Sequence, residues 1–161
     1  MTIEPSTPLP NATFKVWNGG GFDELASSDL FAGKTVALFA VPGAFTPTCH
    51  AKHLPSFLEH ADALKAKGVD SIACVSVNDA FVIDAWAKAQ NVGDKIQMLS
   101  DWNGEFTKAI GMDIDLGVAT LGVRSKRYSM LVKDGEVATM HVEDSPADMA
   151  VSDAKTLLSD L

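Results

Sequence analysis

The sequence predicts an α/β fold in which a central mixed β-sheet is flanked by helices. Two continuous apolar runs, KTVALFAV (34–41) and SIACVSVN (71–78), are typical of central strands that are buried on both faces. Between them, LPSFLEHADALKAKG (54–68) places apolar side chains at helical spacing and closes on a glycine, which favours a helix end. A strand, a helix and a parallel strand form one βαβ unit.

The chain continues with a second helix and a further strand. AFVIDAWAKAQ (80–90) has helical spacing and follows Asn78 and Asp79, two residues that favour the start of a helix. KIQML (95–99) predicts another short strand before the turn residues that follow it. We therefore expect a second αβ pair to extend the sheet.

The last third of the chain predicts a β-hairpin and a helix. The apolar runs 127–132 and 136–143 flank Asp134 and Gly135, and Asp-Gly between such runs favours a tight turn. Residues 145–161, SPADMAVSDAKTLLSDL, fit a terminal helix. The predicted order of strands and helices is that of the thioredoxin-like fold, with helices on both faces of the sheet.

Length and charge limit the organisation and the partners of the chain. A chain of 161 residues with 47% hydrophobic residues is long enough for one substantial core, so we expect a single domain over 1–161. A net charge of -8 argues against nucleic acid or an anionic membrane as a partner. The absence of a basic leader and of a long apolar run predicts a cytoplasmic protein, in which the Pro-rich opening segment is the loosely held part.

The cysteine content restricts any thiol chemistry to single residues. Two cysteines are too few for a disulfide framework. The spacing of Cys49 and Cys74 excludes a C-x-x-C redox motif and the four-cysteine zinc patterns.

The segment VPGAFTPTCHAKHLP (41–55) carries the candidate active site. It follows the carboxyl end of a predicted buried strand, where open α/β sheets place ligands and catalytic groups. Cys49 would lie in the first turn of the next helix, where unpaired N–H groups and the helix dipole favour a thiolate. Thr46 precedes Cys49 by three residues, a spacing that brings its hydroxyl beside the sulfur or makes it a helix cap.

The prolines and glycine of this segment restrict its backbone. Pro42 and Pro47 stiffen the loop, and Gly43 permits a turn that a Cβ would resist. Pro55 removes a backbone hydrogen bond from the following helix, so we expect irregular first turns.

Other interpretations of the same residues stay open at this stage. Cys49 can be a small buried core residue, or it can join His53 and the adjacent His50 in a metal site that lacks further evident ligands. A thiol hydrolase would need a general-base histidine, for which the candidates are His53, His60 and His141.

The segment PGAFTPTCHAKHLPSF resembles the active site of a peroxiredoxin, whose pattern is Pro, three residues, Thr or Ser, two residues, Cys. Pro42, Thr46 and Cys49 occupy those positions. Together with residues 63–86 and 126–137, the segment is similar to the type II, or peroxiredoxin-five-like, branch, and the likeness runs from about residue 5 to the C-terminus.

This resemblance implies a mechanism and one further catalytic residue. Arg127, rather than its neighbour Arg124, matches the family's catalytic arginine. The Cys49 thiolate would attack a peroxide, assisted by Thr46 and Arg127, while Pro42 covers the sulfur. The product is a sulfenic acid that a thiol reduces and that excess peroxide converts to sulfinic acid. No metal or organic cofactor is implied.

The resemblance leaves the second cysteine and the partners open. Cys74 is predicted to be a buried core thiol, and its alternative role is that of the resolving cysteine, as in the plant type II enzymes. The implied reductant is glutaredoxin with glutathione, or thioredoxin. Type II members are homodimers packed through their active-site loops, for which Phe45 and Phe81 are candidate contacts. The non-enzymatic alternative is a thioredoxin-fold binding or chaperone module.

Overall fold

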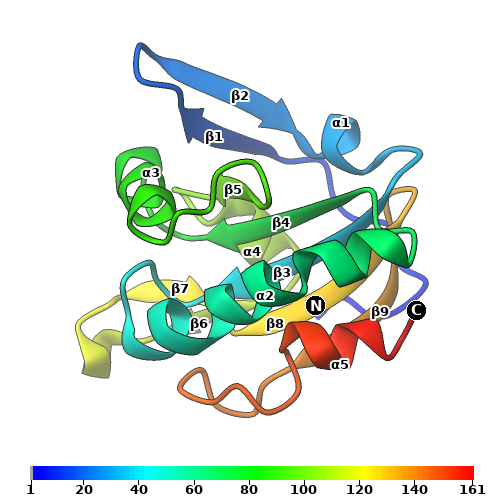
Figure 1. The fold of residues 1–161 in the computed structure, drawn as a ribbon. Coiled ribbons are helices and arrows are strands. Elements are labelled where there is room, and N and C mark those ends of the chain that lie inside the picture. Colours follow the sequence, from blue (N-terminus) through cyan, green and yellow to red (C-terminus); the bar gives the residue numbers. More distant parts are fainter. Residues whose placement is uncertain (1) are drawn as a thin grey trace.

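A computed structural model describes residues 2–161 and shows a mixed seven-stranded sheet with helices on both faces (Figure 1). The strand order is β2-β1-β5-β4-β3-β8-β9. The strands of this sheet are β1 Thr13–Trp17, β2 Phe22–Ala26, β3 Thr35–Val41, β4 Ser71–Ser76, β5 Gln97–Ser100, β8 Tyr128–Lys133 and β9 Glu136–Val142.

The centre of the sheet is the predicted βαβ unit. Strands β3 and β4 pair in parallel, with Phe39 opposite Cys74, and β5 continues the parallel set. Helix α2, Leu54–Ala66, connects β3 to β4, and helix α3, Ala80–Ala89, connects β4 to β5. The Asp79 carboxylate accepts the Val82 N–H at 2.9 Å and begins α3, as its position predicted. Strands β8 and β9 form the predicted hairpin.

Alternate side chains of the central strands pack into two separate hydrophobic cores, one on each face of the sheet. In β3, Phe39 and Val41 pack with α2, α3 and the C-terminal helix α5, Ala154–Leu158, on one face. On the other face, Leu38 and Ala40 pack with α1, Ser27–Phe31, and α4, Glu105–Ala109. Figure 1 shows α2 and α5 side by side in front of the sheet and α4 behind it. Burial on both faces explains why β3 and β4 read as continuous apolar runs.

The first two strands have no counterpart in the sequence-based prediction. β1 and β2 form an antiparallel hairpin at the edge of the sheet, and the Lys15 ammonium pairs with the Glu24 carboxylate. β2 exposes most of its side chains, so its sequence lacks the apolar alternation by which a strand is recognised. A small ribbon, β6 Asp113–Asp115 and β7 Val123–Ser125, and a 3₁₀ turn, Gly117–Ala119, also went unpredicted.

The prediction that the opening segment is loosely held is wrong for the residues that the structure describes. The N–H of Ile3 donates to the Ile110 carbonyl at 2.9 Å, and the Ile3 side chain is buried in the core. The N–H of Ser6 donates to Val137 at 2.7 Å, and Pro8 forms an isolated bridge with Glu136. The segment therefore lies fixed along β9.

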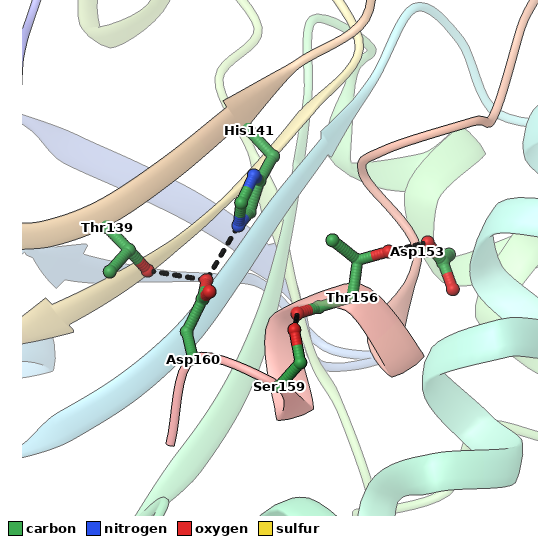
Figure 2. Close-up of polar contacts among 6 residues, drawn as sticks. All are labelled: Thr139, His141, Asp153, Thr156, Ser159 and Asp160. Atoms are coloured by element: carbon green, nitrogen blue, oxygen red, sulfur yellow. Dashed lines mark hydrogen bonds and ion pairs between the residues drawn. The ribbon is translucent and has the colours of Figure 1, made fainter.

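The predicted terminal helix over 145–161 is much shorter than expected. Helix α5 comprises Ala154–Leu158, and residues 144–153 form an irregular loop. Several of their backbone groups bond to side chains outside the loop, such as Arg127 and Glu143, and the bond from the Asp148 N–H to the Ser145 carbonyl closes only a single turn, which accounts for the missing helix. After α5, the Asp160 carboxylate accepts the Thr139 hydroxyl at 3.0 Å and meets His141 Nε2 at 2.6 Å (Figure 2), which ties the C-terminus to β9.

Among residues 2–161, no helix combines the length and the apolar character that crossing a membrane requires.

Candidate active site

The loop after β3 leads into an irregular helix that begins with the candidate cysteine. The Thr46 carbonyl accepts the His50 N–H at 2.8 Å, so Cys49 lies in the first helical turn. Residues Cys49–His53 are π-helical, because the N–H of Leu54 donates to the Cys49 carbonyl five residues earlier. Pro55 has no N–H to donate, and the irregular first turns that it predicted are present.

Two donors converge on the Cys49 sulfur, which is fully buried. Thr46 Oγ1 lies 2.8 Å from Sγ, and Arg127 Nη2 donates to Sγ at 3.1 Å. The guanidinium is a permanent cation, so it stabilises negative charge on the sulfur by Coulomb attraction in a site with little water. The structure thus brings together three of the residues that the sequence selected.

The Thr46 hydroxyl can serve either form of the sulfur. Its oxygen also lies 2.7 Å from the Gly43 carbonyl oxygen, which can only accept. When the hydroxyl donates to Gly43, its lone pairs face Sγ and can accept an S–H. When the sulfur is a thiolate, the same hydroxyl can turn and donate to it. The Thr46 hydroxyl bonds to the Gly43 carbonyl and to Cys49 Sγ rather than to a backbone N–H of the helix, so the side chain does not act as a helix cap.

Arg127 is held at every nitrogen of its guanidinium group. The residue immediately precedes β8 and is 2% exposed. Besides the bond from Nη2 to sulfur, Nη1 donates to His53 Nδ1 at 2.9 Å, and Nε donates to the Pro146 carbonyl at 3.1 Å. These bonds fix the plane of the guanidinium group, so Nη2 keeps pointing toward the Cys49 sulfur.

His53 supports Arg127 and has no free ring nitrogen. Nδ1 accepts from the arginine, and Nε2 donates to the Ser152 carbonyl at 2.9 Å, which assigns the proton to Nε2. Burial and then the charge of Arg127 lower the pKa of His53 to about 3, so the imidazole is neutral. His53 therefore cannot take a proton from Cys49 or bind a metal in this geometry.

The other histidines do not supply a hydrolase or metal site either. His60 Nδ1 lies 2.9 Å from the Ser56 carbonyl. His141, in β9, pairs with Asp160, which follows α5. In the part of the chain that the structure describes, no three His, Cys, Asp or Glu side chains are grouped as metal ligands.

Comparisons with known proteins identify the family. The redoxin family matches residues 5–158 of this chain. Peroxiredoxin-2F, mitochondrial, of Arabidopsis thaliana is 44% identical over 160 residues, which cover 98% of this chain and 79% of the relative. Peroxiredoxin-2B of the same plant is 44% identical over 154 residues, 95% of this chain and 94% of the relative. The chain belongs to the peroxiredoxin family.

A solved structure gives the same result for the fold. Reduced Prx3 of Vibrio vulnificus in complex with hydrogen peroxide superposes on this peroxiredoxin with a TM-score of 0.93 at 49% identity, and 99% of each chain is covered. The predicted thioredoxin-like fold is confirmed, and the chain is a thiol-dependent peroxidase. Its substrates are peroxides. A binding or chaperone module without turnover is not favoured.

The rejected candidate Arg124 and the predicted site residue Pro42 make no hydrogen bond to the Cys49 sulfur. Arg124 donates from Nε to the Leu121 carbonyl at 2.9 Å. A Cβ on Gly43 would lie 3.1 Å from Arg124 Nη1, so the glycine admits that guanidinium against the loop. Pro42 is buried directly after β3, and its role in covering the sulfur stays a prediction.

Cys74 lies in the interior of the sheet. Strand β4 runs between β3 and β5, and the Cys74 side chain is 1% exposed in the same apolar core as Cys49. Burial, and secondarily the nearby Cys49, raise the pKa of the Cys74 thiol well above its ordinary value. Both thiols are free.

Sequence reasoning missed two groups of contacts around the site. Trp86 Nε1 donates to His50 Nδ1 at 3.1 Å, and the Gln90 amide donates to the His50 carbonyl at 3.1 Å, so α3 holds the first turn of the active-site helix. The carbonyls of Pro146 and Ser152 were also missed, because every residue has a backbone carbonyl and the residue type does not show which carbonyl accepts a hydrogen bond.

Proposed function

We propose that Cys49 is the peroxidatic cysteine of this peroxiredoxin and that Thr46 and Arg127 are its catalytic partners. The single observation that supports this assignment is the convergence of Thr46 Oγ1 and Arg127 Nη2 on a buried sulfur, at 2.8 and 3.1 Å. Peroxide reduction needs a cation beside the attacking sulfur and donors for the oxygens, and the Arg127 guanidinium and the Thr46 hydroxyl supply these groups.

The Cys49 thiolate attacks the terminal oxygen of a hydroperoxide in line with the O–O bond. The S–O bond forms as the O–O bond breaks, so the sulfur is oxidised to sulfenic acid and the peroxide is reduced. The other oxygen takes the proton that Cys49 lost on ionisation and leaves as water or an alcohol. Arg127 and Thr46 hydrogen-bond the oxygens and stabilise the charge that moves onto the leaving one. Pro42 limits the access of water to the sulfur.

An external thiol completes the cycle. Two equivalents of thiol reduce the Cys49 sulfenic acid to the thiol and release water and a disulfide. Cys74 is a poor internal substitute, because its raised pKa keeps it a thiol and two flanking strands hold it in place. The reductant in this proposal is glutaredoxin with glutathione, with thioredoxin as the second candidate.

The proposed assembly is a homodimer that packs through the loops around the site. Phe45, in the active-site loop, is 49% exposed, and Phe81, at the start of α3, is 53% exposed. Phe22 and Trp17 pack beside Phe81 with ring centroids about 5 Å apart, so the exposed apolar surface extends to the β1–β2 hairpin. Exposed aromatic surface of this kind favours a partner. Sedimentation velocity at several concentrations tests the dimer.

The proposal also places one domain over residues 1–161 in the cytoplasm. Two free cysteines suit a reducing compartment such as the cytoplasm. Relatives named mitochondrial and chloroplastic make those two organelles the alternatives to this location. Imaging of the tagged native protein in its own cells tests the location.

A rapid-mixing experiment tests the catalytic assignment. Reduced protein is mixed with one equivalent of hydrogen peroxide while tryptophan fluorescence is followed, and the remaining thiols are then titrated. We expect the loss of one thiol per chain, far faster than free cysteine reacts, and no fast phase in Cys49→Ser. Loss of two thiols would make Cys74 the resolving residue, and a fast phase that survives in Cys49→Ser would overturn the assignment.

A further inference from the structure

A loop between β9 and α5 reaches the candidate site through two backbone carbonyls. We call residues 144–153 the C-terminal loop. The Pro146 carbonyl accepts Arg127 Nε–H at 3.1 Å, and the Ser152 carbonyl accepts His53 Nε2–H at 2.9 Å. Because His53 in turn accepts from Arg127, both carbonyls determine how the guanidinium group is oriented.

The Glu143 carboxylate sets the shape of this loop. Oε1 accepts the Ala150 N–H at 2.9 Å, and Oε2 accepts the N–H groups of Val151 at 2.9 Å and Ser152 at 2.7 Å. The residue is 7% exposed, and its own N–H donates to the Arg127 carbonyl at 3.0 Å. One buried carboxylate thus holds the far end of the loop close to Arg127, the residue that precedes β8.

Opposing effects act on the Glu143 carboxyl. Burial alone would raise its pKa, but the hydrogen bonds from Ser152, Ala150 and Val151 lower the pKa below its ordinary value. The group is therefore ionised at neutral pH, and its bonds to the loop are charge-assisted, the stronger class of hydrogen bond.

Other contacts hold the first half of the C-terminal loop and the start of α5, whereas Glu143 holds residues 150–152. Thr48 Oγ1 donates to the Ala147 carbonyl at 2.8 Å, and the Ala154 N–H donates to Ser56 Oγ at 3.0 Å. At the end of the loop, Figure 2 shows Asp153 bonded to Thr156 across the first turn of α5, and Asp160, after the helix, tied to β9. Replacing Glu143 should therefore loosen residues 150–152 without detaching the helix.

We propose that Glu143 is a positioning residue for peroxide reduction. Its carboxylate holds residues 150–152 of the C-terminal loop so that the Ser152 carbonyl fixes His53, and His53 in turn orients the Arg127 guanidinium toward the Cys49 sulfur. The inference rests on the proposed roles of Cys49 and Arg127. A donor that can rotate away from the sulfur stabilises the thiolate and the departing oxygen less well.

The test is Glu143→Gln, which keeps the size of the side chain and removes its charge. We expect the second-order rate constant with hydrogen peroxide to fall about tenfold, the effect of weakening one charge-assisted hydrogen bond at the reacting sulfur. We also expect a smaller thiolate fraction of Cys49 at neutral pH, measured by thiolate absorbance. Amide hydrogen exchange should quicken at residues 150–152.

A matched control separates positioning from stability. Asp101 is a second buried carboxylate, which accepts the N–H groups of Phe106 at 3.2 Å and Thr107 at 2.9 Å and the Thr107 hydroxyl at 2.7 Å. It makes no hydrogen bond to Cys49, Arg127 or the C-terminal loop. Asp101→Asn should lower the melting temperature to a similar extent and keep the wild-type rate constant and thiolate fraction.

Each outcome decides the proposal. A slower reaction and a smaller thiolate fraction in Glu143→Gln, but not in Asp101→Asn, support it. Wild-type values for the glutamine variant, or equal losses in both variants, overturn it. If the glutamine variant does not fold, Glu143→Asp, which keeps the charge on a side chain shorter by one methylene, replaces it, and its rate constant and thiolate fraction are compared with those of Asp101→Asn. A wild-type protein without a fast Cys49 reaction would instead refute the proposed function.

Discussion

Acidification should destabilise this peroxiredoxin through His53. The ordinary pKa of histidine is 6.5, and burial and the neighbouring Arg127 lower that of His53 to about 3 in the folded chain. Between these two values the unfolded chain binds a proton that the folded chain does not. The free energy of unfolding therefore falls as the pH drops through this window. A protonated Nδ1 could not accept from Arg127 and would place two cations side by side.

The size of the effect follows from the same two values. Each pH unit below the ordinary pKa favours the unfolded chain by about 1.4 kcal/mol, so the loss reaches about 3 kcal/mol near pH 4. Native domains are stable by only about 5–15 kcal/mol, which makes such a loss easy to measure.

Urea unfolding of the wild type and of His53→Gln at about pH 7 and about pH 4 tests this expectation. Glutamine stays neutral over this range and keeps an acceptor for Arg127, so its free energy of unfolding should fall less on acidification, by about 3 kcal/mol. The titration of the carboxylates is common to both proteins and cancels. His60→Gln removes an imidazole of α2 that does not bond to Arg127, and it should keep the acid sensitivity of the wild type. Parallel losses in the wild type and in His53→Gln would refute the reasoning.

Substitutions of Arg127, Thr46 and Cys74 test the other roles. Arg127→Ala should slow the reaction with peroxide roughly 10- to 150-fold, measured by stopped flow, because a hydrogen bond to a charged group contributes about 1.5–3 kcal/mol. Equal slowing in Arg124→Ala would contradict the choice of Arg127 over Arg124. Thr46→Val should slow single-turnover oxidation about tenfold or more, and Thr46→Ser, which keeps the hydroxyl, should stay close to the wild type. Cys74→Ser should leave the first oxidation of Cys49 nearly intact and lower stability by about 1–3 kcal/mol, measured by urea unfolding, since it buries a new hydroxyl.

The parts of the fold that could be predicted are those with a local pattern. β3, β4 and α2 follow from apolar runs and helical spacing, and the β8–β9 hairpin follows from Asp134 and Gly135. The β1–β2 hairpin escaped prediction because β2 is mostly exposed and lacks that pattern. The edge of a sheet constrains its residues less than the centre does, so its sequence carries less information.

The site divides in the same way. Cys49 and Thr46 could be selected because strand, loop and helix start are contiguous in the sequence. Arg127 lies 78 residues from the sulfur that it contacts, and only the family resemblance pointed to it. No local spacing could have chosen between it and Arg124.

The remaining determinants of the site could not be predicted because their contacts run through the backbone. Arg127 and His53 are oriented by the carbonyls of Pro146 and Ser152, which any residue at those positions would supply. What is specific is the shape of the loop that presents those carbonyls, and the Glu143 carboxylate holds the part of that loop that ends at Ser152. Glu143 follows directly after a strand and resembles any surface acid until its three N–H partners are known. The residues that aim a catalytic group can therefore lie outside every motif that identifies the group itself.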